Sequence, residues 1–418
     1  MMIIGVIKGK VHMPISSMIS GTIQKYYDQL PSETQELLDA SVERIVEQKR
    51  KGGKVMVITG SGPNIHEGVT SLVAELMDKG IVDAVSTSSA VVAHELAGTL
   101  DKVKRVDGTN LGLSPTLLPK GNTFEITQMS EEQFALVRQE MMIDEELIRQ
   151  GNAMGGDIII KAAGNMAYPM GLRTERLGRE IVAMARTYGL PFETVAGWGA
   201  DPRTMLGAGA RKGLPVLVSV PQLIGGGGVG LAIGDSISIS ERCMRMANMI
   251  DSSTILIESA IALTQEIHDG PFETYTGHGV WAGWDGYRTT SLEGKTLVRI
   301  DLDLNLKRAW DMQRNDATVQ MAIDKGLPKT KLTGIPFRME MSGFARLESS
   351  LPVIGDIGVI WPVLAWKVAN ALNIQLDFIS HPQQTPEGQA MREWIVDIIQ
   401  PLNRAAMLAK ASEFRRSA

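Results

Sequence analysis

Apolar residues along the chain fall into short blocks with two different spacings. Uninterrupted apolar runs rich in β-branched residues predict buried strands near 54–59, 82–86, 157–162, 192–195, 215–220, 253–257, 296–301 and 352–355. Between them, apolar positions three or four residues apart predict helices over 32–51, 67–79, 173–188, 201–212, 305–325 and 357–372. The pattern therefore indicates strands and helices that alternate.

The first helix shows both a start and a stop signal. Ser32 and Gln35 have the spacing of a capping box, and Gly52 and Gly53 end the apolar stripe. We expect this helix to precede the first core strand.

Strands without polar alternation, separated by helices, are typical of a parallel sheet covered on both faces. The expected fold is therefore a doubly wound, mostly parallel, Rossmann-like α/β sheet. We assign 1–52 to an N-terminal helical extension, 53–380 to the α/β domain with an inserted region near 275–345, and 381–418 to a C-terminal helical tail. Segments 103–156 and 275–295 look like loops or excursions from the sheet.

Composition narrows the class of protein. With 42 Lys and Arg against 47 Asp and Glu, the 418-residue chain has a net charge of −5, which does not favour a nucleic-acid partner. An apolar fraction of 44% excludes disorder as the main state. The single cysteine, Cys243, excludes a disulfide framework, and we expect a cytoplasmic protein.

Two apolar segments resemble targeting or membrane signals. The N-terminal apolar run precedes Lys8 and Lys10, which is the reverse of a secretory signal. The uncharged stretch Gly213–Gly234 contains Pro215, Pro221 and four glycines, which favours a strand and a loop over a membrane span. We therefore predict no membrane partner.

Ligands of doubly wound sheets bind outside the carboxyl ends of the strands. After the first core strand, Gly60, Ser61 and Gly62 favour either a phosphate-binding loop or a tight turn. After the second, Ser88 and Ser89 suit contacts to a ribose or phosphate, or a helix cap.

Further strand ends carry glycines or acids. The run Gly225–Gly228 indicates close approach of the backbone to a ligand, or a loop that closes over one, and Asp235 is placed to accept hydrogen bonds there. Asp301 and Asp356 follow later strands, where an acid either holds ribose hydroxyls or caps a helix.

Four side chains are candidates for proton transfer: His66, His94, Glu95 and Lys161. Structural alternatives stay open, since the histidines fit a packed interior and Lys161 fits a solvent-facing strand end. The sequence has no H-x-x-x-H or H-E-x-x-H spacing, so we predict no metal site.

Several motifs occur in one order: Gly62–Gly68, Gly80–Ala84, Ala90–Glu95, Gly108–Gly112, Leu214–Val218, Val298–Asp301 and Ile354–Gly358. The series resembles the LOR/SDH-type domain of NAD-dependent ornithine cyclodeaminases, related in fold to deoxyhypusine synthase. The segments 176–181 and 213–216 are similar to deoxyhypusine synthase as well. The resemblance implies an NAD site at the carboxyl edge, a tetramer or dimer, and NAD contacts from Gly60, Ser61, Gly62, Ser88, Ser89, Asp301 and Asp356.

One position departs from the resemblance. Deoxyhypusine synthase has a lysine nucleophile in the stretch matching 342–346, and Phe344 stands there in this chain. A phenyl ring forms no imine, so we do not expect deoxyhypusine synthase activity.

Two hypotheses follow. The first is an NAD-dependent enzyme that acts on a small amine or amino acid through hydride transfer and an imine. The second is a nucleotide-binding regulatory protein of the same fold without catalysis.

Overall fold

The computed structural model describes residues 17–60, 62–164, 167–218, 233, 236–259, 283–284, 286, 288–335 and 347–417. Its main sheet has six strands in the order β6-β2-β1-β7-β8-β9, and all pairs are parallel. The strands are β1 (Val55–Thr59), β2 (Ala84–Thr87), β6 (Val216–Val218), β7 (Ile255–Ser259), β8 (Thr296–Asp301) and β9 (Ser350–Ile354). In sequence this is the 3-2-1-4-5-6 order of the Rossmann fold, which confirms the predicted fold class.

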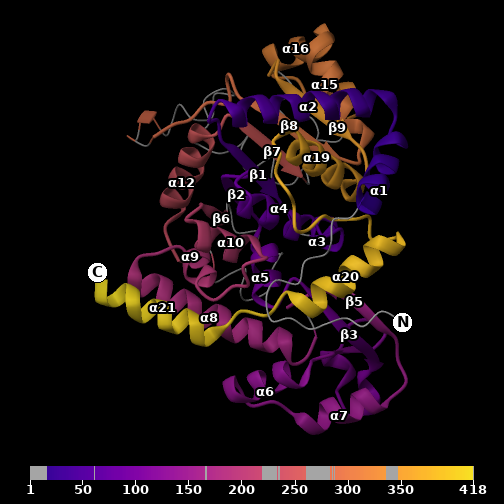
Figure 1. Ribbon diagram of the computed structural model, residues 1–418, viewed down its shortest axis with the longest axis vertical. Helices are drawn as coiled ribbons and strands as arrows, with labels where there is room; N and C mark the ends of the chain where they lie inside the picture. The colour runs from indigo at the N-terminus through magenta and orange to yellow at the C-terminus, as the bar shows by residue number, and fades with distance from the viewer. Residues whose placement is uncertain are drawn as a thin grey trace.

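The central strand β1 explains why a parallel sheet forms. All five of its residues are buried, and successive side chains point to opposite faces. Val55 and Val57 pack into a cluster with α2 (Ser32–Arg50), α4 (Val69–Asp78) and α19 (Ile357–Ala371). Met56 and Ile58 pack on the other face, where α12 (Ile239–Ser252) lies. Figure 1 shows these helices on either side of the strands.

The first helix differs from its predicted start. Helix α2 begins at Ser32, but Pro31 occupies its N-cap and makes no side-chain cap hydrogen bond. Gln35 instead donates through Nε2 to the carbonyl of Tyr27 in the preceding helix α1 (Ser17–Asp28). The predicted Ser32–Gln35 capping box is therefore wrong, because the connection from α1 engages the glutamine.

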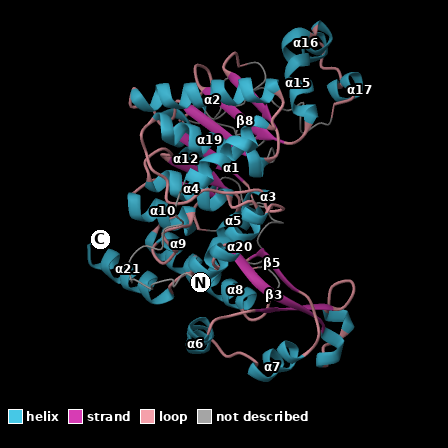
Figure 2. Cartoon of the chain, turned by 45° about the vertical axis from the view of Figure 1, so that its right-hand side comes forward, coloured by secondary structure: helices cyan, strands magenta, loops and turns pink. Residues whose placement is uncertain are grey.

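A second sheet lies outside the main one, at the lower end of the molecule in Figure 2. It has three antiparallel strands in the order β4 (Thr123–Thr127), β3 (Leu100–Asp107) and β5 (Ile158–Ala162). The expectation that 157–162 joins the core sheet is wrong. Segment 103–156 was expected to form loops or an excursion from the sheet, and the structure shows the excursion. Helices α6 (Glu131–Glu140) and α7 (Glu145–Ala153) also lie in that segment.

Residues 192–195, predicted as a strand, form part of helix α9 (Phe192–Gly197). Pro191 precedes the helix as its N-cap, and Glu193 lies in its first turn. A run this short does not distinguish a buried strand from a buried helix, and the flanking proline favours the helix start.

The other helices connect or cover the two sheets. They are α3 (Pro63–His66), α5 (Ser89–Leu96), α8 (Met170–Tyr188), α10 (Met205–Lys212), α15 (Leu304–Asn315), α16 (Ala317–Asp324) and α17 (Lys329–Thr333). The predicted helical tail contains α20 (Pro386–Ile398) and α21 (Arg404–Ser417). Helix α20 contacts β3 and β5, while α21 packs on α8 and α9 (Figure 1). None of the described helices is long and apolar enough to cross a membrane.

Candidate functional site at the carboxyl edge of the sheet

The strand order puts the switch point between β1 and β7, where doubly wound sheets have their binding crevice. From β1 the sheet continues through β2 and β6 on one side and through β7, β8 and β9 on the other. The connections that follow β1 and β7 therefore run in opposite directions from this point. Register pairing aligns Thr59 with Thr87 of β2 and with Ser259 of β7. Three neighbouring strands therefore end in hydroxyl side chains.

Several of these hydroxyls are buried without a hydrogen-bond partner. Thr59, Thr87 and Ser88 are at most 1% exposed, and the side-chain oxygens of all three lack a partner. Ser259 differs, because its hydroxyl donates to Asn64 Oδ1 at 2.6 Å. A buried polar group left unpaired costs about 1–3 kcal/mol, so a group of them at a sheet edge indicates ligand contacts.

Ser88 is the clearest example of a buried hydroxyl without a partner among the described residues. It occupies the N-cap of α5 with an extended backbone, yet it makes no side-chain cap hydrogen bond. Serine at this position ordinarily accepts from a backbone N–H of the first turn. The Ser88 hydroxyl is therefore not engaged in capping α5.

The turn after β1 depends on glycine. Gly62 has φ 78° and ψ −121°, a conformation that side chains with a Cβ rarely adopt. Asn64 Nδ2 donates to the carbonyl of Gly60 at 3.4 Å and braces the turn. Helix α3 is only four residues long, so the dipole that favours an anion here comes from α5. Ser61 lies outside the described residues.

His66, His94 and Lys161 come together where this edge meets the second sheet. His66 ends α3, His94 lies in the last turn of α5, and Lys161 belongs to β5. Burial lowers the pKa of both imidazoles, and Lys161 lowers each further. Both rings are therefore neutral near pH 7.

The contact of His94 fixes its tautomer. Nδ1 is hydrogen-bonded to the carbonyl oxygen of Ala163, and a carbonyl oxygen only accepts. Nδ1 therefore carries the proton, and Nε2 carries the lone pair. This arrangement makes Nε2 a proton acceptor.

Lys161 is held by an acid of the second sheet. Its Nζ lies 2.7 Å from Glu125 Oε2, and Arg105 Nε lies 2.9 Å from the other oxygen of Glu125. The lysine is thus a paired cation that faces the histidines.

Glu95 contacts a different part of the molecule from His94. Its carboxylate accepts the backbone N–H groups of Met205 at 2.9 Å and Leu206 at 3.0 Å, at the start of α10. Burial raises the pKa of Glu95 to about 7. Glu95 therefore caps the N-terminus of α10. Among the described residues, no hydrogen bond joins Glu95 to His94.

Of the two strand-end acids, Asp356 caps a helix, and Asp301 holds the turn that follows its strand. Asp301 Oδ1 accepts the N–H of Asp303, and Asp356 Oδ1 accepts the N–H of Gly358 at the start of α19. Asp301 ends β8, two strands from β1, so about 10 Å separate it from β1. Gly225, Gly226, Gly227, Gly228 and Asp235 lie outside the described residues.

Sequence reasoning did not find Thr59, Glu67 or Arg392 at this edge. Arg392, on α20, lowers the pKa of His66 and donates to the carbonyl of Ile160. Glu67 accepts from the backbone N–H of Gln383 at 2.6 Å. Of these three residues, only Thr59 could have been found from the sequence, as a hydroxyl at the end of the first strand. Glu67 and Arg392 contact residues that lie more than 300 positions away in the chain.

The chain resembles solved structures at low identity but matches no sequence family. No family model matches the sequence, and no curated protein matches it. A LOR/SDH protein from Methanococcus maripaludis S2 has 11% identity and a TM-score of 0.38, covering 83% of this chain and 70% of that one. AgrE, solved with ornithine and NAD+, has 12% identity and a TM-score of 0.40, covering 82% and 34%. ArgZ, an arginine dihydrolase of cyanobacteria, has 11% identity and a TM-score of 0.38, covering 82% and 32%.

A LOR/SDH protein is thus among the structures that this chain resembles, as the sequence motifs predicted. The chain spans about a third of the length of AgrE and ArgZ. Identities and TM-scores of this size carry no functional argument, so function is argued from the site.

Proposed function

We propose that the chain is an NAD-dependent enzyme that acts on a small amine or amino acid. The observation that carries the proposal is the set of buried, unpartnered hydroxyls of Thr59, Thr87 and Ser88 at the switch point of a Rossmann-ordered sheet. In such sheets this crevice takes dinucleotides.

The residues present fit a dinucleotide. The hydroxyls would donate to phosphate or ribose oxygens, and the N-terminus of α5 would favour the negative charge. Gly60 and Gly62 leave the backbone beside β1 uncovered by side chains. Ser61, Ser89, Gly225–Gly228, Asp235, Asp301 and Asp356 remain predicted contacts. When bound, NAD accepts a hydride from the carbon that bears the amine.

The histidines would handle the proton of the same step. Loss of a hydride from the amine-bearing carbon leaves an imine, and a proton must leave the ammonium nitrogen. His94 Nε2 would accept it, with His66 as the second neutral imidazole. Burial would keep both imidazoles neutral, and Lys161, held by Glu125, would add to this effect by charge repulsion.

The test has two stages. Calorimetric titration with NAD and NADH should show one site per chain. An absorbance screen for NADH formation over small amines and amino acids should then identify substrates. Absence of binding by either nucleotide would refute the proposal at its first step.

A second candidate is a nucleotide-binding regulatory protein. Phe344, in place of the lysine of deoxyhypusine synthase, favours it. Tight nucleotide binding with no turnover across the screen would establish this alternative. A homo-oligomer and a cytoplasmic location remain predictions, the first of which light scattering on the purified chain would test.

A further inference from the structure

A cavity of about 560 Å³ lies beside β6, away from the β1–β7 crevice. Its walls come from α9, α10 and α12, with Lys410 of α21 at the rim. It reaches β6 near Leu214 and Pro215, at the amino end of that strand rather than at its carboxyl end. Its volume lies in the range of ligand pockets, about 300–1,000 Å³.

A buried carboxylate lies at one end of the cavity. Glu193 is a lining residue with a side chain that is 1% exposed. Its Oε1 accepts from Arg242 Nη1 at 2.7 Å and from the backbone N–H of Val218 at 3.0 Å. Its Oε2 is buried and has no hydrogen-bond partner among the residues that the structure describes. A donor from a ligand is the group that this oxygen lacks.

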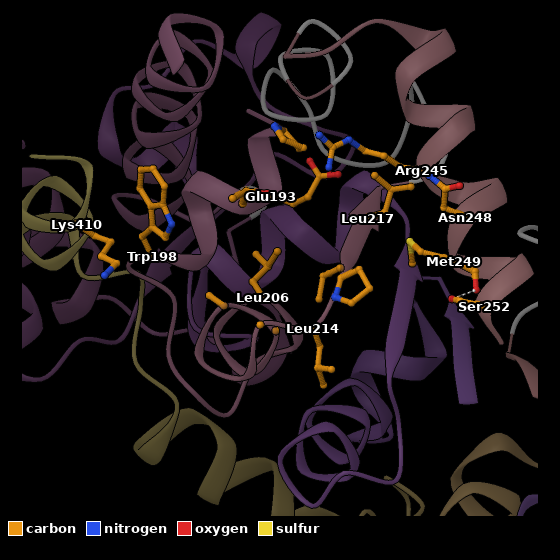
Figure 3. Close-up of a pocket in the computed structure, with 17 residues that line it drawn as sticks. Glu193, Trp198, Leu206, Leu214, Leu217, Arg245, Asn248, Met249, Ser252 and Lys410 are labelled. Carbon is orange, nitrogen blue, oxygen red and sulfur yellow. Dashed lines mark hydrogen bonds between the residues drawn. The ribbon is translucent and has the colours of Figure 1, made fainter. Parts of the chain in front are cut away.

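A cation also lines the cavity. Arg245 extends from α12 toward Glu193 in Figure 3 and is 42% exposed. Its Nε and Nη2 both donate to Glu241 Oε1, at 3.1 and 2.7 Å. Nη1 makes no hydrogen bond to a described residue, so it can meet a carboxylate from outside.

The rest of the cavity is largely apolar. Leu206, Leu214, Leu217 and Met249 line it below the two charged groups in Figure 3. An apolar floor penalises a charged or strongly polar group that is buried against it.

From this arrangement we infer that the cavity is a second binding site, for an α-amino acid with an apolar side chain. The ammonium group donates to Glu193 Oε2, the neighbouring carboxylate meets Arg245, and the side chain packs on the leucines. An α-amino acid carries its ammonium and carboxylate groups on one carbon, so the two groups can meet Glu193 and Arg245 within the same cavity. Arg245 points toward Glu193 in Figure 3.

The experiment is a calorimetric titration of the full chain with L-leucine, without nucleotide. We expect one site per chain with millimolar or tighter affinity. N-acetyl-L-leucine lacks the ammonium, leucinol lacks the carboxylate, and L-ornithine has a charged side chain, so each should bind at least tenfold more weakly. Equal binding of N-acetyl-L-leucine would overturn the role given to Glu193, and no binding of L-leucine would overturn the site.

Two variants locate the binding. Ala210→Phe places a ring in the cavity from an exposed position on α10. Arg245→Gln removes the cation. Each should weaken L-leucine binding about tenfold or more, which is about 1.4 kcal/mol. Arg149→Gln is the matched control, because Arg149 pairs with Glu146 on α7 outside the cavity and its loss should change nothing.

Undiminished binding in both variants would place the amino acid elsewhere and overturn the inference. Because the titration contains no nucleotide, its outcome is independent of whether the crevice binds NAD.

Discussion

Thr59 and Thr87 are register partners across β1 and β2, and both carry a buried hydroxyl that no described residue satisfies. Each hydroxyl is a cost to the free protein, and both lie beside the N-cap Ser88. Removing the hydroxyls therefore distinguishes a binding role from a structural one. In a binding role, their loss should weaken nucleotide affinity without lowering the free energy of unfolding.

Thr87→Val keeps the shape of the side chain and removes the oxygen. We expect nucleotide affinity to fall about tenfold, or ~1.4 kcal/mol, while the free energy of unfolding of the free protein stays level or rises. Ser88→Ala should behave in the same way. Calorimetric titration and urea unfolding on the same preparations measure both quantities, and a loss of stability with unchanged affinity would assign these hydroxyls to the fold.

NAD should bind more tightly than NADP. The motivation is Asp301 at a strand end of the nucleotide edge, where a carboxylate repels a 2′-phosphate. Asp301→Asn preserves an acceptor for the N–H of Asp303 and removes the charge. The variant should bind NADP more tightly than the unaltered protein does, which reduces the preference for NAD over NADP. If the unaltered protein bound NADP more tightly than NAD, the role given to Asp301 would be contradicted.

His94→Gln should reduce turnover about 100-fold or more, the usual contribution of a proton-transfer group, with little change in nucleotide affinity. Because burial lowers the pKa of His94, the rate should stay constant as pH falls through 6.5 and decline only below it. A rate that declines with its midpoint at or above pH 6.5 would exclude this imidazole as the base. His66→Gln gives the comparison for the second imidazole.

Glu95 should make the fold less stable as pH rises. Its pKa is about 7 in the folded protein against 4.5 ordinarily, so the folded state binds more protons between these values. The free energy of unfolding should therefore fall by up to about 3 kcal/mol across this range, relative to Glu95→Gln. Other titrating groups are shared by the two proteins, so the difference between their urea-unfolding curves isolates Glu95. Parallel curves from pH 4.5 to 7 would mean that its pKa is ordinary.

Arg242→Leu should destabilise the fold by about 3–5 kcal/mol, because it leaves the carboxylate of Glu193 buried without its partner. The double variant with Glu193→Leu should recover much of that loss. Thermal unfolding of the unaltered protein, the two single variants and the double variant provides the test, and additive losses would show that the two side chains act independently.

The main sheet was predictable because its strands are buried on both faces. Val55–Thr59 is uniformly apolar apart from its last residue, and burial of the whole strand leaves that pattern in the sequence. The run at 158–162 has a similar composition, but Ile158 is 53% exposed and Ile159 pairs antiparallel with Val103. Which sheet a strand joins depends on this long-range pairing, which local composition does not record.

The candidate site was predictable only in part for a related reason. His94 and Glu95 are neighbours in sequence, yet a helix turns them about 100° apart, so one contacts Ala163 and the other caps α10. Arg392 approaches His66 from α20, and no local pattern marks that approach. Hydroxyls at strand ends were readable, whereas their lack of partners is a property of the folded structure.

The position of β1 in the sheet has a consequence for synthesis of the chain. Val55 pairs with Ile255 of β7, so 200 residues must follow before β1 acquires its second neighbour. Until then this apolar strand is an edge, with unpaired N–H and C=O groups along one side. A nascent chain in this state offers a template for association with its own copies. We therefore expect ribosome-bound chains that end before β7 to require chaperone protection, and chains released at that length to aggregate.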